Sequence, residues 1–476
     1  MPLGNREGVA QGRKATPQPG NQPVHEKRAS AGSGNGVERH RRTSTCFNRK
    51  NPARGGVGQR GNEMLSQSDM LARLGARREN YSLERDLYCD EGVLAHDLDQ
   101  IFYKEWLFAI PSCEIPKTGN FATLQVGAYP VVITRGADGM VRAFHNVCRH
   151  RGQRLCAKET GSTPKLVCPY HQWTYDLDGK LLYARDMQEG FDPAQHGLKK
   201  VHCVDLGGMV FICLAEVPPA IADLAKTVTT YLAASGLKKA KVAHSSTIIE
   251  KGNWKLVIEN NRECYHCGGS HPSLCRTYSD NPRMTAMEGP NAASPDILEH
   301  WARCEAAGLP SRFVNHPQMQ WRLARIPLLN SAESYTLSGK AAVKGKRMGD
   351  MPFNDAGSLL FFHYPNTWNH FLADHAIVFR VLPISATETQ VTTKWLVPED
   401  AVEGVDYDLA DLTTVWMNTN DEDRQVVEEN QKGILSPAYE PGPYSTIQEE
   451  GVIQFVDWYC KTMTARLAPK PAMAAE

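Results

Sequence analysis

The pattern of hydrophobic and polar positions changes between successive parts of this chain. Residues 64–104 carry apolar positions at helical spacing, which continues around Ile101, Trp106 and Leu107, so we expect N-terminal helices there. Residues 105–215 hold short apolar runs that are interrupted by Gly and Asp at turn positions. This second part is predicted to form short antiparallel strands in a compact domain.

Residues 216–476 mix helical and strand-like patterns. Helices are predicted over 221–236 and over 409–433, each closed by its final glycine. Between them, residues 358–397 alternate well enough to give several long antiparallel strands. A sheet wrapped around a helix is the natural packing of such elements, so the chain is predicted to have an α+β fold.

Residues 1–63 differ from the rest because they are rich in Gly, Asn, Arg, Pro and Gln and lack apolar periodicity. They hold twelve Lys and Arg against four Asp and Glu, a net charge of about +8, and such a segment buries too little surface to offset its ordering entropy. An organelle transit peptide and a nucleic-acid-binding tail are alternatives. We favour a third interpretation, that translation begins near Met64 and that residues 1–63 are either not native or a disordered extension.

Composition narrows the classes of function. The formal net charge is +0, so no overall field points to nucleic acid or to an anionic membrane. No apolar run approaches the ~20 residues that span a bilayer, and no signal-peptide core is present. The thirteen cysteines show no framework of paired spacings, which is typical of a reducing compartment. We therefore expect a cytoplasmic protein.

The first candidate metal site is the pattern C-x-H-x17-C-x-x-H, formed by Cys148, His150, Cys168 and His171. Two thiolates on one iron and two imidazoles on the other are the ligands of a Rieske [2Fe–2S] centre. A Cys2His2 zinc site uses the same four atoms, but zinc fingers usually keep the two cysteines in one pair and the two histidines in the other. Here each pair contains one of each, which favours the Rieske centre.

The second candidate site lies around residues 259–271. If this segment is helical, then Glu259, Glu263 and His266 fall on one face, and Gly268–Gly269 ends the helix so that His271 can return toward it. Two imidazoles and one carboxylate form the facial triad of non-haem Fe(II) and leave positions open for dioxygen.

The carboxylate ligand is predicted to be Asp423. In the helix over 409–433, Asp423 shares a face with Trp416 and Asn420, whereas Asp421 points to nearly the opposite side. Asp421 and Glu422 are interpreted as a solvated acidic run. In the same way Cys264 and Cys267, which resemble a redox dithiol, are interpreted as packing residues around the iron.

The Rieske domain of ring-hydroxylating oxygenase α subunits closely resembles two segments of this chain, FHNVCRHRGQRLC and LVCPYHQWTYDLDGKL. The family pattern E-N-x-x-x-[D/E]-x-Y-H-x4-H matches residues 259–271, and D-x4-E-x2-Q matches Asp423, Glu428 and Gln431. The resemblance covers nearly everything from residue 64 onward. It implies an antiparallel β Rieske [2Fe–2S] domain over 105–215 and a helix-grip catalytic domain over 216–476.

The resemblance also implies cofactors and partners. The [2Fe–2S] cluster is expected on Cys148, His150, Cys168 and His171, and a mononuclear Fe(II) on His266, His271 and Asp423. Electrons from NAD(P)H are expected through a separate flavin and iron–sulfur reductase, since the chain has no convincing nucleotide fingerprint. Cluster and iron of one chain are too far apart in the family, which pairs them across a homotrimer interface.

Glu263 departs from the Asp that ring-hydroxylating members usually have here. By the resemblance, this catalytic residue links His171 of the partner subunit to His266, and its identity is similar to that of the branch acting on quaternary ammonium compounds. The resemblance favours N-demethylation of stachydrine (proline betaine), with release of formaldehyde. Glycine betaine, carnitine and choline are alternatives, and an aromatic ring-hydroxylating dioxygenase is a more distant one. A Rieske electron carrier and a zinc-binding protein represent other classes.

A quaternary ammonium has no N–H group, so a site must hold it with aromatic faces or a carboxylate. Aromatic residues cluster over 361–371, and the candidate substrate residues there are Tyr364, Trp368, His370 and Phe371. A stripe of core aromatics is the alternative for each of them. A substrate carboxylate needs a donor such as His370, Asn369 or an Arg, and the sequence does not choose among these.

The first prediction concerns the N-terminal segment. Deleting residues 1–63 should leave folding and turnover nearly unchanged, because a segment without apolar periodicity contributes little buried surface. Soluble yield, melting temperature and rate of oxygen consumption of the truncated protein measure this directly. A loss of soluble protein would instead assign the segment to the fold.

Overall fold

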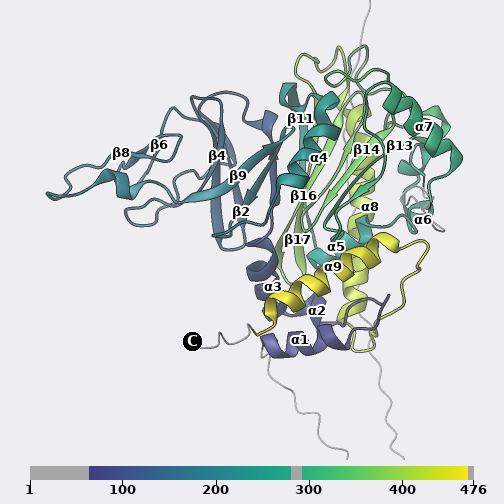
Figure 1. The fold of residues 1–476 in the computed structure, drawn as a ribbon, viewed down its shortest axis with the longest axis horizontal. Helices are drawn as coiled ribbons and strands as arrows, with labels where there is room; N and C mark the ends of the chain where they lie inside the picture. Colours follow the sequence, from purple (N-terminus) through teal and green to yellow (C-terminus); the bar gives the residue numbers. More distant parts are fainter. Residues whose placement is uncertain (1–63, 280–291, 470–476) are drawn as a thin grey trace, which may run out of the picture. The chain divides into compact units, whose positions relative to one another are not determined.

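The computed structural model describes residues 64–279 and 292–469 (Figure 1). The segment 1–63, for which the sequence predicts disorder, lies outside the described residues. The helices of the described part are α1 (Gln67–Ala76), α2 (Asp86–Cys89), α3 (Glu91–Asp97), α4 (Ala222–Leu232), α5 (Trp254–Asn261), α6 (Cys267–Ser270), α7 (Pro295–Ala306), α8 (Leu409–Leu435) and α9 (Glu450–Leu467). None of these is long and apolar enough to cross a membrane.

The first sheet has seven antiparallel strands in the order β1-β10-β9-β4-β3-β2-β5. Its strands are β1 (Leu107–Pro111), β2 (Asn120–Val126), β3 (Tyr129–Arg135), β4 (Val141–His145), β5 (Thr160–Ser162), β9 (Lys200–Leu206) and β10 (Met209–Cys213). A smaller antiparallel sheet is made of β6 (Leu166–Val167), β7 (Thr174–Tyr175) and β8 (Leu181–Tyr183). Alternating apolar residues give this part its own core.

The second large sheet is also antiparallel, in the order β11-β17-β16-β15-β14-β13-β12. Its strands are β11 (Ala240–Glu250), β12 (Val314–Asn315), β13 (Trp321–Ile326), β14 (Ser358–His363), β15 (Thr367–Phe371), β16 (Ala376–Ser385) and β17 (Glu388–Pro398). Helix α5 contacts β16 and β17, and α8 contacts β11. The predicted α+β class, with antiparallel sheets and a helix against the second one, is confirmed; the boundary at residue 215 stays a prediction.

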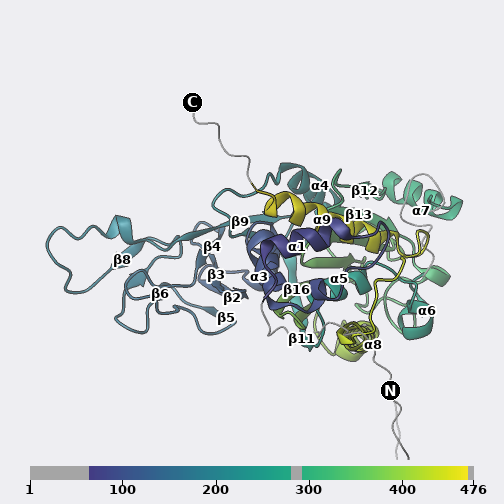
Figure 2. The same ribbon diagram turned by 90° about the horizontal axis from the view of Figure 1, so that it is seen from below.

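Buried polar groups tie the N-terminal helices to helices α5 and α9. Asp97 and Lys255 form an ion pair with an Nζ–Oδ2 distance of 2.6 Å, and both side chains are fully buried. Trp254 and Tyr459 donate hydrogen bonds to the same carboxylate. The Asp97 carboxylate therefore joins the end of α3 to α5 and α9. Helices α1 and α9 lie side by side in both views (Figures 1 and 2).

Two helix predictions are wrong in part. The helical spacing predicted around Trp106 and Leu107 gives way to strand β1, whose five residues are all buried. A short apolar run that is buried on both faces has no periodicity to separate strand from helix. Gly236 does close its helical segment with a φ of 57°, but α8 continues past Gly433 to Leu435. The helix stops before Ser436, because Ser436 precedes Pro437 and the residue before a proline is unfavourable in helical conformation.

Candidate metal centres

The two Cys/His loops have matching backbone geometry. In the first loop, the N–H of Cys148 donates to the Gln153 carbonyl at 2.8 Å, and the N–H of Gly152 donates back to the Cys148 carbonyl at 3.0 Å. In the second loop, the N–H of Cys168 and that of Gln172 make the equivalent bonds at 2.8 and 3.0 Å.

The fourth residue after each cysteine adopts a positive φ, 79° at Gly152 and 62° at Gln172. Positive φ is unfavourable for residues with a Cβ, so only Gly152 adopts it without a steric cost. Each loop thus turns back on its own cysteine in the same way.

The thiols and the imidazoles of these loops separate by exposure. Cys148 and Cys168 are buried, and burial together with the nearby Cys148 thiol raises the pKa of Cys168. His150 and His171 are exposed, with ring centroids 4.6 Å apart, and His150 stacks on Trp173. Two adjacent thiols on the inner side and two adjacent imidazoles on the outer side fit the donor set of a Rieske [2Fe–2S] cluster.

The second site brings together three ligand atoms from distant segments. His266 Nε2 lies 2.9 Å from His271 Nε2, and these two atoms lie 3.2 and 3.0 Å from Asp423 Oδ1. Three ligands at right angles around one ion stand about 1.4 metal–ligand distances apart, so this triangle fits an ion about 2.1 Å from each atom. The site therefore fits a two-His, one-carboxylate iron centre.

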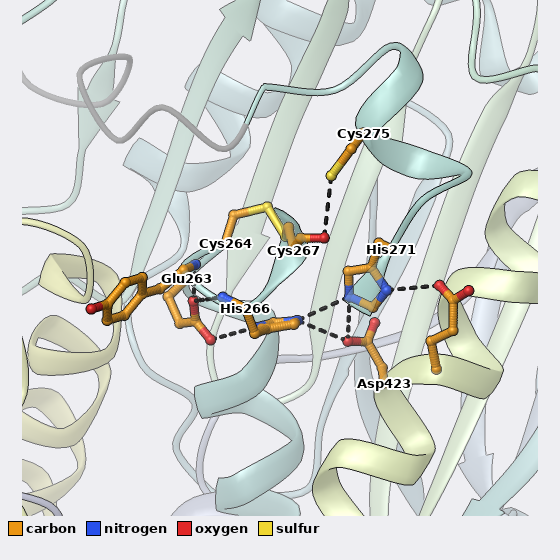
Figure 3. Close-up of a disulfide and its surroundings, with 9 residues drawn as sticks. Glu263, Cys264, His266, Cys267, His271, Cys275 and Asp423 are labelled. Carbon is orange, nitrogen blue, oxygen red and sulfur yellow. Dashed lines mark hydrogen bonds and ion pairs between the residues drawn. A yellow bond between two sulfur atoms is a disulfide. The ribbon is translucent and has the colours of Figure 1, made fainter. Parts of the chain in front are cut away.

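The remaining imidazole nitrogens are bound to carboxylates (Figure 3). His266 Nδ1 lies 2.5 Å from Glu263 Oε1, and His271 Nδ1 lies 2.9 Å from Glu422 Oε2. Burial lowers the pKa of His266, but its hydrogen bonds to Asp423 and Glu263 outweigh this and raise it to about 9. The carboxylates around His266 thus stabilise positive charge at this site. Carboxylates that hydrogen-bond to an imidazole in this way also orient it toward a bound metal.

The local path of the chain differs from the prediction. Helix α5 ends at Asn261, so Glu259, Glu263 and His266 are not on one helical face. Glu259 is buried in the protein, where its carboxylate accepts hydrogen bonds from two tyrosine hydroxyls, and burial raises its pKa to about 7. Helix α6 begins at Cys267 and runs through Gly268–Gly269, which the sequence predicts to be the break. The two histidines meet because they flank this single turn.

Two further interpretations are corrected. Cys264 and Cys267 are joined in a disulfide instead of packing as separate thiols, and Figure 3 shows it beside His266. Glu422 is not a solvated residue, since it accepts the hydrogen bond of His271. Asp421 is exposed, as predicted, and it pairs with Arg424. A helical face alone does not reveal that the flanking Glu422 carboxylate reaches around to His271.

A cavity of about 110 Å³ adjoins the three ligand atoms. Of the four substrate candidates, only His370 lines it. Phe371 lies in the core on the opposite face of the sheet because neighbours in a strand alternate, and that face packs against β1 and β10. Trp368 shares the face of His370 but stacks on Phe379, and Tyr364 accepts a hydrogen bond from Arg262.

Phe362, one of the clustered aromatic residues over 361–371, does line the cavity. The sequence prediction missed four other residues that line it, namely Arg262, Arg322, Leu360 and Trp416. The alternation of side chains along residues 358–371 could have indicated Leu360 and Phe362, because these two residues share one face of the sheet with His370. The arginines carry no such signal, since their positions depend on how distant segments pair.

The fold and these two centres together define an iron-dependent oxygenase of the Rieske class. Family models agree: "Rieske [2Fe-2S] domain" matches residues 105–203, and "Ring hydroxylating alpha subunit (catalytic domain)" matches residues 237–465. The chain belongs to the family of Rieske oxygenase α subunits, and it carries a [2Fe–2S] cluster and a mononuclear iron.

Individual relatives extend over most of the chain. It is 50% identical over 406 residues to the glycine betaine monooxygenase oxygenase subunit of Pseudomonas aeruginosa (strain UCBPP-PA14), covering 85% of this chain and 94% of the relative. The protein of the same description from Chromohalobacter salexigens is 49% identical, covering 84% and 89%. A solved quaternary ammonium Rieske monooxygenase with a bound inhibitor is similar in fold, with a TM-score of 0.63 at 23% identity, covering 84% of this chain and 99% of that one.

The second prediction compares neighbouring acids on α8. Glu422→Gln should weaken iron binding at the His266/His271/Asp423 site by about 10–100-fold, because carboxylates that orient metal-ligating imidazoles contribute that much to affinity. Asp421→Asn is the matched control and should bind iron like the wild type, since Asp421 is exposed and pairs with Arg424 instead of an imidazole of the iron site. Iron retained during titration with a chelator measures both. Equal affinities for the two variants would exclude this role for Glu422.

Proposed function

We propose that this chain is the oxygenase component of a monooxygenase that removes one N-methyl group from glycine betaine. The identity of 50% along 94% of a glycine betaine monooxygenase oxygenase subunit carries this proposal. Stachydrine, which the sequence motifs favour, also combines an N-methylated quaternary ammonium with a carboxylate and is the second candidate. The cavity is compatible with this class, because it combines apolar and aromatic side chains with arginines.

The proposed reaction consumes one dioxygen and two electrons. Hydroxylation of an N-methyl C–H bond gives a carbinolamine, whose C–N bond breaks to release formaldehyde. Glycine betaine, O2, NAD(P)H and a proton thus give dimethylglycine, formaldehyde, water and NAD(P)+. A bound iron supplies the activation of dioxygen, and the electrons come from NAD(P)H through a separate flavin and iron–sulfur reductase.

We assign the metal ligands as the sequence predicts. Cys148, His150, Cys168 and His171 hold the cluster, and His266, His271 and Asp423 hold the mononuclear iron. The buried thiols and exposed imidazoles of the two loops support the cluster assignment. The short distances among the ligand atoms of His266, His271 and Asp423 support the iron assignment. Glu263 and Glu422 fix the orientation of the two imidazoles.

Glu263 has a second proposed role in a homotrimer. Its carboxylate already binds His266 Nδ1, and it would also bind His171 of the partner subunit. The imidazole of His171 is exposed, so an approaching subunit can reach it. The bridge would connect a cluster in one chain with the iron in the next.

The test of the function uses purified protein with a compatible reductase. The protein should be red-brown and should contain about three irons per chain, two in the cluster and one mononuclear. A panel of glycine betaine, stachydrine, carnitine and choline is scored for formaldehyde and for product mass. Glycine betaine should give the highest kcat/KM. A colourless zinc protein, or turnover of aromatic hydrocarbons alone, would overturn the proposal.

A further prediction isolates the Glu263 bridge. Glu263→Gln should keep both metal centres and still accept electrons from the reductase into the cluster. Transfer from the cluster to the mononuclear iron should slow by orders of magnitude, because a neutral amide does not hold two imidazoles as a carboxylate does. Rapid-mixing absorbance of the pre-reduced cluster, with substrate and dioxygen, measures this rate. Reoxidation of the cluster at the wild-type rate in Glu263→Gln would exclude the bridging role. Asp423→Ala is the comparison variant, and it should lose the mononuclear iron while keeping the absorbance spectrum of the cluster.

A further inference from the structure

Two arginines line one wall of the cavity that contains the three iron-ligand atoms. Arg262 is the residue that follows α5, and Arg322 lies on β13, where it is paired with Phe362 of β14. Their guanidinium carbons lie 4.4 and 5.3 Å from the centroid of the Phe362 ring. Two cations therefore share one aromatic neighbour.

Arg262 is held firmly but is not fully satisfied. Its Nε donates to the Tyr364 hydroxyl at 2.5 Å, and the residue is only 5% exposed. Its Nη1 is buried and has no hydrogen-bond partner within residues 64–279 and 292–469. Burial of an unpaired donor costs free energy, and more for a charged group than for a neutral one. A ligand oxygen in the cavity would remove this cost.

The backbone around Arg262 is also fixed by a close approach. A Cβ at Gly451, in the first turn of α9, would lie 2.1 Å from the Arg262 carbonyl oxygen and 3.1 Å from its Nη2. Only glycine allows α9 to pack this closely against Arg262. The guanidinium is thus positioned before any ligand binds.

Arg322 makes no hydrogen bond or ion pair through its guanidinium in the described part of the chain. Burial and the positive charge of Arg262 lower its pKa to about 9. Two nearby positive charges in a partly buried wall disfavour each other unless an anion lies between them. Arg binds carboxylates in a bidentate manner, and more specifically than Lys does.

The acidic residues of the cavity are arranged differently. Glu263 and Asp423 are bound to the imidazoles of the iron site. Glu450, at the start of α9, also lines the cavity and accepts a hydrogen bond from Gln454. Two of these three carboxylates are thus bound to imidazoles. The negative charge of Glu450 instead acts on Arg322, where it partly offsets the effect of Arg262 on the pKa of Arg322.

We propose that Arg262 and Arg322 bind the carboxylate of the substrate, so that its quaternary ammonium end is directed toward the iron site. This inference rests on the proposed function, because it takes the substrate to be a betaine. The indole of Trp416 lines the same cavity and offers an aromatic face for the ammonium group. The two arginines thereby determine specificity for zwitterions over simple cations.

The test compares glycine betaine with its methyl ester, which keeps the ammonium group and lacks the negative charge. For Arg322→Met, the Kd of glycine betaine measured by calorimetry on the holoenzyme should rise about 10–100-fold, the loss expected for a charge-assisted pair. The Kd of the ester should not rise. Arg322→Lys should recover part of the affinity, since it keeps the charge without the planar fork.

Controls separate a binding role from a structural one. Arg312→Met removes a half-exposed arginine that pairs with Glu305 outside the cavity and should bind like the wild type. Loss of affinity for both ligands in Arg322→Met would show collapse of the cavity, and an unchanged Kd for glycine betaine would show that Arg322 makes no contact. Either result overturns the proposal. If Arg322→Met does not fold, the wild-type protein tests the proposal instead. It should bind the methyl ester about 10–100-fold more weakly than glycine betaine, and equal Kd values for the two ligands would overturn the proposal.

The outcomes also distinguish this inference from the proposed function. If the wild type demethylates no betaine but Arg322→Met still loses affinity for glycine betaine alone, the carboxylate site stands and the proposed reaction fails. If the wild type demethylates glycine betaine while Arg322→Met binds it normally, the reaction stands and the carboxylate site fails.

Discussion

The docking of α8 onto the turn that precedes α5 is the interaction on which the iron site depends. The N–H of Asn253 donates to Gln431 Oε1 at 2.8 Å, and the N–H of Lys251 donates to Glu428 Oε1 at 3.2 Å. Between them, a Cβ at Gly252 would lie 2.4 Å from a methyl of Val427, so only glycine permits this contact. The bond from Asn253, the N-cap of α5, also satisfies a backbone donor at the start of a helix, where such donors otherwise lack partners.

This docking gives a physical reason for the pattern D-x4-E-x2-Q. Glu428 and Gln431 anchor α8, and Asp423 lies about one turn earlier on the same helix, where its Oδ1 meets both imidazoles. The ligand triangle is therefore built from one long helix, α8, and the single-turn helix α6, which His266 and His271 flank. Glu263 and Glu422 then approach from opposite sides and fix the imidazole rings, so each histidine is held at both of its nitrogens.

Features that are local in sequence could be predicted, and features that depend on pairing between distant segments could not. The pairs Cys148/His150 and Cys168/His171 lie within single loops, and Asp423 follows from the face of one long helix. The missed helix end at Asn261 and the role of Glu422 arise from packing around His266 that no periodicity records. The disulfide is local in sequence, but the spacing of Cys264 and Cys267 alone does not show whether the two thiols are joined. Phe371, a candidate substrate residue, lies on the face away from the cavity, because the sequence shows alternation but not which face meets the helices and which meets β1 and β10.

The arginine wall illustrates the same limit and has a consequence for the chemistry. Arg322 meets Phe362 only through the register of β13 on β14, a pairing across about forty residues of sequence. Arg262 and Glu263, in contrast, are consecutive, and Gly451 fixes the backbone at Arg262. The segment that presents a cation to the substrate cavity therefore also aims the carboxylate that holds His266. A shift of this backbone by an ångström would move both groups together, so substrate orientation and imidazole orientation depend on one close contact between α9 and the end of α5.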